Sequence, residues 1–222
     1  MKTLFIVNPV AGRHKSLEVW NGLKDTIDFP FDFALTGAPG KATELTKGAV
    51  KQGFTRVVAV GGDGTVCEVV NGLVGTDVDM GIIPTGTGND FVRTLGIPQE
   101  PVKALKFIKQ GRTDRVDLGK HERGFFINVG GAGLDAEVVK ATNENAKFLK
   151  GTAAYVYGLV TTLIRFCPRE AVIEIDGKVL KRRLWLVSVA NGKYYGGGMM
   201  IGPDAVVDDG LLDVCIVNDM SR

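Results

Sequence analysis

Apolar residues in the first half of the chain alternate between two kinds of pattern. Short runs rich in β-branched residues predict buried strands at residues 4–7, 31–35, 57–60 and 80–83. Between them, apolar residues three or four positions apart predict helices at 43–51, 65–73 and 90–95, with two more near Ser16 and Pro101. Because strands alternate with helices, the pattern predicts an α/β fold in which helices cover both faces of a parallel sheet.

Two of these helices carry start signals. Ser16 is a residue type that often caps a helix N-terminus, so it is the predicted N-cap of the first helix. Pro101 suits the first turn of the last helix, on which Val102, Leu105 and Ile108 are predicted to face inward.

The second half of the chain has a different pattern. Strands are predicted at 125–129, 171–175, 179–190 and 211–217, and helices at 134–141 and 148–166. Asp176-Gly177 between two strands is a strong hairpin signal. Strands joined by hairpins predict a mostly antiparallel sheet or sandwich. We therefore expect two domains, 1–119 and 120–222, with the boundary near 117–121.

The run Gly61-Gly62-Asp63-Gly64 follows the predicted strand 57–60 and precedes a predicted helix. Glycines let the main chain lie close to a ligand, and the start of a helix attracts anions, so this turn is a candidate phosphate site. Asp63 adds a carboxylate, which beside phosphates commonly acts through Mg²⁺. The run lacks the lysine of the P-loop motif, and a purely structural turn is the alternative.

Two more polar, glycine-containing turns follow predicted strands. Asn8-Pro9-Val10-Ala11-Gly12 comes after the first strand, and Pro84-Thr85-Gly86-Thr87-Gly88-Asn89-Asp90 comes after the fourth. The carboxyl ends of parallel strands share one edge of a sheet, where ligands of open α/β folds bind. The three turns therefore predict one ligand site at this edge.

Several of these residues have a plain structural alternative. Glu68 lies three residues after Thr65, as in a capping box, so it either caps the helix or contacts a nucleotide or its metal. Thr87 and Asn89 are suited to cap the short helix 90–95 as well as to contact phosphate or ribose.

The segment 201–214 places four aspartates around a turn. Asp209-Gly210 is typical of a hairpin turn. Alternatively, Asp209 and nearby backbone carbonyls form a Mg²⁺ site, with Asp90 and Asp117 in the same carboxylate network.

Composition narrows the class of protein. With 222 residues and a formal net charge of +2, the chain is large enough for a proper core and shows no sign of bulk nucleic-acid binding. Basic clusters at 120–123 and 181–183 are either a solvated surface or contacts with anionic lipid headgroups. Three widely spaced cysteines suggest a cytoplasmic location, and the apolar run 151–164 is too short to span a bilayer.

Four motifs together resemble the diacylglycerol kinase catalytic domain, in particular its soluble bacterial branch of the DagK and YegS type. They are Asn-Pro-x-x-Gly, Gly-Gly-Asp-Gly-Thr-x-x-Glu, Pro-x-Gly-Thr-x-Asn-Asp and Asp-Gly-x-Leu-Asp-Val, in this order along the chain. The resemblance implies a kinase that uses ATP and Mg²⁺ to phosphorylate a lipid hydroxyl, with diacylglycerol as the expected acceptor.

The resemblance also implies roles for individual residues. Asp63 is expected to be essential for catalysis. Residues expected to bind ATP are Asn8, Pro9, Val10, Ala11, Gly12, Thr36, Gly61, Gly62, Asp63, Gly64, Thr65, Val66, Cys67, Glu68, Thr87 and Asn89. Residues expected at the metal are Asp209, with backbone groups of Val206 and Leu211, and the carboxylates of Asp90 and Asp117.

Members of this family usually continue past the last motif to an Asp-Gly-Glu segment that carries the proposed general base. No Asp-Gly pair in this sequence is followed by glutamate, so we expect a truncated member without that base. An NAD kinase, which shares the glycine turn, and a nucleotide-binding protein without catalysis are the alternatives. The expected partner is a lipid at a membrane surface, and a second copy of the chain is the other candidate partner. The apolar residues of the predicted helix 148–166 either border the acyl-chain site or pack into the core as one face of an amphipathic helix.

Overall fold

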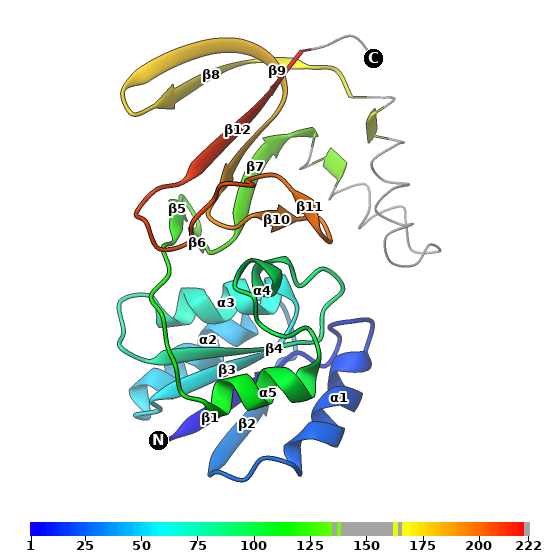
Figure 1. Cartoon of the computed structure of the whole chain (residues 1–222), viewed down its shortest axis with the longest axis vertical. Helices are drawn as coiled ribbons and strands as arrows, with labels where there is room; N and C mark the ends of the chain where they lie inside the picture. Colours follow the sequence, from blue (N-terminus) through cyan, green and yellow to red (C-terminus); the bar gives the residue numbers. More distant parts are fainter. Residues whose placement is uncertain (135–136, 139–161, 164–165, 220–222) are drawn as a thin grey trace.

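The computed structural model describes residues 1–134, 137–138, 162–163 and 166–219 (Figure 1). Its N-terminal domain contains a parallel sheet in the order β2-β1-β3-β4. The strands are β1 (Thr3–Val7), β2 (Phe31–Leu35), β3 (Arg56–Gly61) and β4 (Asp79–Pro84). The helices are α1 (Lys15–Lys24), α2 (Lys41–Lys51), α3 (Asp63–Leu73), α4 (Asp90–Thr94) and α5 (Pro101–Lys109).

Alternating strand residues build a core on each face of this sheet. Leu4 and Ile6 of β1 point to the side covered by α2, α3 and α4. Phe5 and Val7 point to the other side, where Trp20 of α1 and Leu105 of α5 complete the core. Since side chains alternate along a strand, the apolar runs of the central strands supply both faces, and the predicted three-layer α/β arrangement is confirmed.

Three details of the predicted helices are wrong. Ser16 is not an N-cap: it lies inside the first turn of α1, fully buried, and accepts a hydrogen bond from the Thr85 hydroxyl at 2.8 Å. The helix α3 begins at Asp63 rather than at Thr65. On α5, Val102 is 47% exposed, and Ala104 takes the inward position beside Leu105.

The C-terminal domain is mostly antiparallel, as predicted. The long strand β9 (Lys178–Ala190) pairs with β7 (Val129–Gly133), β8 (Arg169–Ile175) and β12 (Asp213–Asn218). Short ribbons are formed by β5 (Gly119–His121) with β6 (Gly124–Phe126), and by β10 (Tyr194–Tyr195) with β11 (Met199–Met200).

The β8–β9 hairpin turns at Asp176-Gly177, where both residues have positive φ, 50° and 77°. This geometry is that of a type I′ turn, which Asp-Gly favours, so the hairpin prediction is confirmed. The predicted strand 125–129 is in fact two strands, β6 and β7, separated at Ile127 and Asn128. Apart from a few positions, the predicted helices 134–141 and 148–166 lie outside the described residues.

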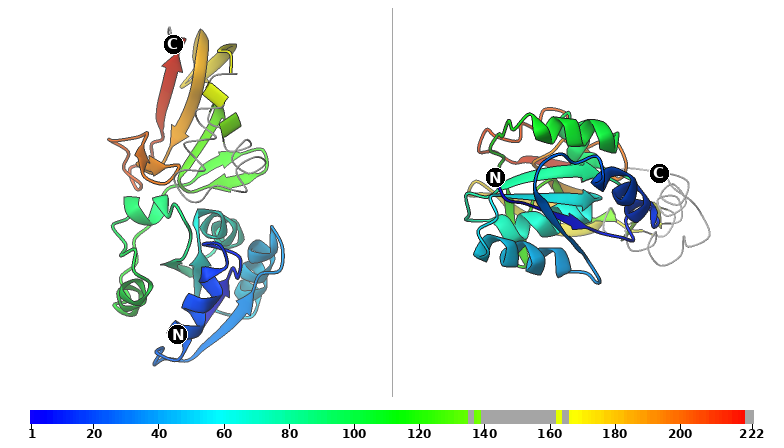
Figure 2. Two further views of the ribbon diagram at one scale, coloured as in Figure 1. Left: turned by 90° about the vertical axis from the view of Figure 1, so that its right-hand side faces the viewer. Right: turned by 90° about the horizontal axis from the view of Figure 1, so that it is seen from below.

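The two domains are stacked along the long axis and touch at the helices α3 and α4 (Figures 1 and 2). The side chain of Asn71 on α3 forms two hydrogen bonds with the backbone of Phe125 on β6, at 2.8 and 2.9 Å. The boundary near 117–121 stays a prediction. Within the described part of the chain, no helix has the length and apolar character needed to cross a membrane.

Candidate active site at the junction of the two domains

The three predicted turns meet at the carboxyl-end edge of the parallel sheet. The amide side chain of Asn8 donates a hydrogen bond to the Thr65 hydroxyl at 2.9 Å, which joins the first turn to α3. The backbone N–H of Thr85 donates to the carbonyl of Gly61 at 2.9 Å. This bond joins the second turn, which follows β3, to the third turn, which follows β4. The predicted convergence is therefore present.

Glycine is required where the second and third turns touch. A Cβ placed on Gly86 would lie 2.4 Å from the Cα of Gly62, and one on Gly62 would lie 3.0 Å from the Cα of Gly86. Only two residues without side chains allow the main chains to approach this closely.

The start of α3 is open. Apart from its chain neighbours and the backbone of its own helix, no atom lies within 4 Å of the position that a Cβ on Gly64 would take. The first amides of a helix have no partner within the helix, and they carry the positive end of its dipole. An eleven-residue helix that begins with an open turn, beside two close-packed glycine loops, can accept an anion.

The carboxylate of Asp63 points from α3 to the start of α4. It accepts a hydrogen bond from the backbone N–H of Phe91 at 3.1 Å. Burial raises the pKa of the Asp63 carboxyl above its ordinary value, the Phe91 N–H opposes this, and the nearby Asp90 carboxylate raises the pKa further. Gly88 lies between the two acids, because a Cβ on it would be 3.1 Å from an oxygen of Asp63 and 3.2 Å from one of Asp90.

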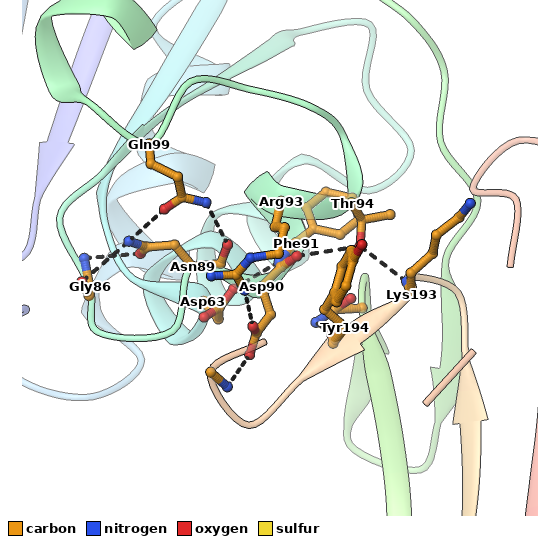
Figure 3. Close-up of polar contacts among 12 residues, drawn as sticks. Asp63, Gly86, Asn89, Asp90, Phe91, Arg93, Thr94, Gln99, Lys193 and Tyr194 are labelled. Atoms are coloured by element: carbon orange, nitrogen blue, oxygen red, sulfur yellow. Dashed lines mark hydrogen bonds and ion pairs between the residues drawn. The ribbon is translucent and has the colours of Figure 1, made fainter. Parts of the chain in front are cut away.

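Asp90 connects the N-terminal domain to the C-terminal domain. One of its oxygens accepts from the Arg93 guanidinium at 2.6 Å, and the other accepts from the backbone N–H of Gly197 at 2.8 Å (Figure 3). At the other end of α4, the Thr94 hydroxyl accepts from the backbone N–H of Lys193 at 3.0 Å. Sequence reasoning missed Arg93, Thr94 and Gly197. The signal for Gly197 in the sequence is the glycine run 196–198, which indicates a tight loop but not its partner.

Glu68 does not form the predicted capping box. Because α3 begins at Asp63, Thr65 lies within the helix, and no capping bond joins it to Glu68. The carboxylate of Glu68 instead accepts from the backbone N–H groups of Gly40 and Ala42, at 2.9 and 3.0 Å, at the start of α2. The two acids of α3 therefore bind the N-termini of two neighbouring helices, a favourable place for negative charge.

The predicted caps of α4 are also wrong. Asn89 occupies the N-cap position, but no side-chain capping bond forms there. Its amide group bonds back to Gly86, accepting from the N–H at 3.0 Å and donating to the carbonyl at 3.2 Å. Thr87 is exposed on the same loop. Asn89 thus shapes the third turn, while Asp63 supplies the acceptor at the start of α4.

The remaining predicted nucleotide residues take different positions. Val66 is buried in the core, and the Cys67 thiol, whose pKa is raised by burial, lies 3.5 Å from the carbonyl of Phe125. Thr36 follows β2 and bonds through its N–H to Val7. Val10 is 58% exposed at the sheet edge. The Val66 side chain is therefore closed to a ligand, and its backbone N–H donates to the Gly62 carbonyl at 3.1 Å.

The predicted metal residues divide into two groups. Asp117 accepts from the backbone N–H of Gly210 at 2.7 Å, and Asp209 accepts from that of Leu211 at 2.9 Å. This brings Asp117 to the turn that contains Val206, Asp209 and Leu211. Asp90 belongs to the group around Asp63, and among the described residues no hydrogen bond or ion pair joins it to Asp117 or Asp209.

The turn at Asp209-Gly210 does not join two paired strands, because no strand directly precedes it and β12 begins only at Asp213. The hairpin alternative for this dipeptide is therefore wrong. No cluster of three or more His, Cys, Asp or Glu side chains suited to a metal ion is present among the described residues.

A separate hollow of about 590 Å³ lies beside β2 and α2. Its lining is mostly apolar and includes Phe31, Phe33, Leu45 and Phe54. None of the predicted site residues lines it, so the sheet edge described above remains the candidate active site.

Comparison with known proteins identifies relatives along the whole chain. Residues 2–121 match the family described as the diacylglycerol kinase catalytic domain, and residues 128–222 match the YegS C-terminal NAD kinase beta sandwich-like domain. The diacylglycerol kinase of Bacillus subtilis is 36% identical over 218 residues, which cover 96% of this chain and 72% of that protein. A Pseudomonas putida protein named "Probable lipid kinase YegS-like" is 36% identical over 191 residues.

Solved structures of diacylglycerol kinases are also similar to this chain. A crystal structure of a diacylglycerol kinase from Bacillus anthracis superimposes with a TM-score of 0.75 at 33% identity, over 98% of this chain and 73% of that one. The chain spans only part of its relatives, reaching 63% of the length of the Pseudomonas putida protein.

Proposed function

Because this chain belongs to the diacylglycerol kinase catalytic domain family, whose relatives include lipid kinases, we propose that it transfers the γ-phosphate of ATP to a lipid hydroxyl. The acceptor in this proposal is diacylglycerol, and the product is phosphatidic acid. Since such an acceptor resides in a bilayer, the protein acts in peripheral contact with a membrane surface.

The observation that carries the proposal is the open start of α3 against the Gly62–Gly86 contact. Bare main chain and unpaired helix amides suit the phosphates of ATP, because they offer donors without steric hindrance. Phosphoryl transfer needs little beyond positioning and charge stabilisation, which such a cradle supplies. The chain thus binds the phosphates through α3 and orients them through the three turns.

The carboxylates present fit Mg²⁺, which prefers oxygen ligands and is often held by one or two carboxylates with water. Asp117 and Asp209 lie at one turn, and each retains acceptor capacity beyond its single backbone bond. Asp63 places a further carboxylate at the start of α3. When bound, Mg²⁺ supplies positive charge that offsets the charge of the phosphates.

The direct test is an assay of the purified 222-residue chain with labelled ATP, Mg²⁺ and dioctanoylglycerol in mixed micelles, run beside an assay with NAD. We expect label in phosphatidic acid and none in NADP. Label in NADP would instead support the NAD kinase alternative. ATP binding by calorimetry without any labelled product would support the alternative of a nucleotide-binding protein without catalysis.

Gly64→Ala tests the phosphate cradle. No protein atom obstructs the new methyl group, and alanine favours helix over glycine, so the variant should gain about 0.5 kcal/mol of stability. The methyl group occupies the space of the phosphates, so the Kd for ATP should rise about tenfold or more, measured by calorimetry. Gly48→Ala in α2 is the matched control and should gain stability with an unchanged Kd. Unchanged ATP affinity in Gly64→Ala would contradict this placement of the phosphates.

A further inference from the structure

The ribbon of β10 and β11 extends from the C-terminal domain over α4 (Figures 1 and 3). Its two strands are joined by Gly196, Gly197 and Gly198, all with positive φ, which glycine adopts readily. The bond from the Gly197 N–H to Asp90 fixes this loop to the start of α4. The ribbon is therefore held beside the two acids Asp63 and Asp90.

One face of the ribbon is turned toward the N-terminal domain. Tyr194 lies on it, since the centre of its ring is 5.6 Å from the Arg93 guanidinium of α4. Met200 is the cross-strand partner of Tyr194, and directly opposed residues of an antiparallel pair share a face. Met200 is nevertheless 56% exposed, so the side chain lies at the junction without being packed into it.

An exposed methionine at this place is not explained by core packing. Its unbranched thioether adapts to apolar partners of varied shape. A polar acceptor such as a nucleotide sugar gains nothing from it, whereas a hydrocarbon chain does. The proposed acceptor must bring its hydroxyl to the start of α3, and Asp90 ties the ribbon to the start of α4, which the Asp63 carboxylate of α3 contacts.

We propose that Met200, beside the Tyr194 ring, contacts the acyl chain of the lipid acceptor close to its hydroxyl and so favours a lipid alcohol over a polar one. This inference rests on the proposed function, because it names the part of the same site that selects the acceptor. Met200 is a specificity residue here and takes no part in the chemical step.

The test compares Met200→Gln, which keeps the length of the side chain but makes it polar, with Met200→Leu, which keeps it apolar. We expect Met200→Gln to raise the KM for dioctanoylglycerol about tenfold, with kcat and the KM for ATP unchanged within about twofold. Met200→Leu should keep the wild-type KM for dioctanoylglycerol. Val172→Thr on β8, where the side chain is 67% exposed, is a control that should change nothing.

A binding measurement separates this inference from the proposed function. The wild type and Met200→Gln are sedimented with phosphatidylcholine vesicles, with and without dioleoylglycerol, in the absence of ATP. We expect dioleoylglycerol to increase the bound fraction of the wild type only. Equal binding of both proteins, or equal KM values for the lipid, would overturn the inference. A wild type that binds lipid but phosphorylates none would refute the proposed function, and a loss of that binding in Met200→Gln would still support the role of Met200.

Discussion

Asp63→Asn is expected to reduce phosphoryl transfer about 100-fold or more while the protein stays folded. An asparagine oxygen can still accept from the Phe91 N–H, so the start of α4 keeps its partner. The substitution removes only the negative charge at the start of α3, and a neutral amide attracts a divalent cation far less than a carboxylate does. The measurement is kcat with ATP and dioctanoylglycerol. Retention of wild-type kcat would contradict the role of Asp63.

The same variant should be more stable than the wild type at neutral pH. Because the folded-state pKa of Asp63 is raised, chiefly by burial, its stabilising contribution is present below the ordinary value of 3.8 and is lost as pH rises through the folded-state pKa. At pH 7 the wild type therefore contains a buried charge that Asp63→Asn lacks.

Thermal unfolding across the pH range checks this expectation. The Tm of Asp63→Asn should exceed that of the wild type at neutral pH, and the difference should shrink below pH 3.8, where the unfolded wild type is protonated as well. Asp63→Ala is the companion variant: it lacks the charge as Asp63→Asn does but also removes the acceptor of the Phe91 N–H, so it should be about 1 kcal/mol less stable than Asp63→Asn. A pH-independent difference in Tm would contradict the assignment of a buried charge.

Gly86→Ala should be damaging in both stability and activity. Its methyl group would lie 2.4 Å from the Cα of Gly62 and 2.7 Å from the Asn89 side-chain oxygen, and the first of these is main chain that cannot rotate away. We expect a loss of about 1–3 kcal/mol in the free energy of unfolding, measured with urea. Because the turns separate, kcat/KM for ATP should fall about 100-fold.

Gly22→Ala is the matched control for Gly86→Ala. Gly22 lies in α1, and a Cβ on it would have no atom within 4 Å, so the variant should be at least as stable as the wild type and fully active. If Gly86→Ala behaves in the same way, the close contact between the two glycine turns has no role in holding the phosphates.

The sequence predicts the architecture because its signals are local. The apolar runs of β1, β3 and β4, the glycines between strand and helix, and Asp176-Gly177 each specify a conformation through neighbouring residues alone. The convergence of the three turns also follows from topology, because parallel strands share one carboxyl edge.

The capping pattern could not be predicted in this way. A capping box is a local rule, and here the local partners are not used: Glu68 binds the start of α2, 26 and 28 residues earlier in the chain, and Asp63 binds Phe91, 28 residues later. Such bonds depend on how helices pack side by side on the sheet. Sequence spacing contains no direct signal for that, so long-range caps replaced the predicted local ones.

The junction between the domains was missed for a related reason. In the sequence, Arg93 and Thr94 are ordinary positions of a predicted short helix, and the run Gly196 to Gly198 indicates only a turn. Their roles appear only when the two domains are stacked, since Gly197 is 107 residues from Asp90 and Lys193 is 99 residues from Thr94.

The helix α4 has only five residues, yet it is held from both sides. At its first turn, the backbone N–H of Phe91 donates to Asp63. Across the domain junction, Asp90 and Thr94 accept hydrogen bonds from the backbone N–H groups of Gly197 and Lys193. If one domain tilts against the other, α4 must either follow the tilt and strain its bond to Asp63, or release the glycine loop. Together with the Asn71–Phe125 bonds of α3, the contacts of α4 thus couple the orientation of the two domains to the place where the phosphates are proposed to lie.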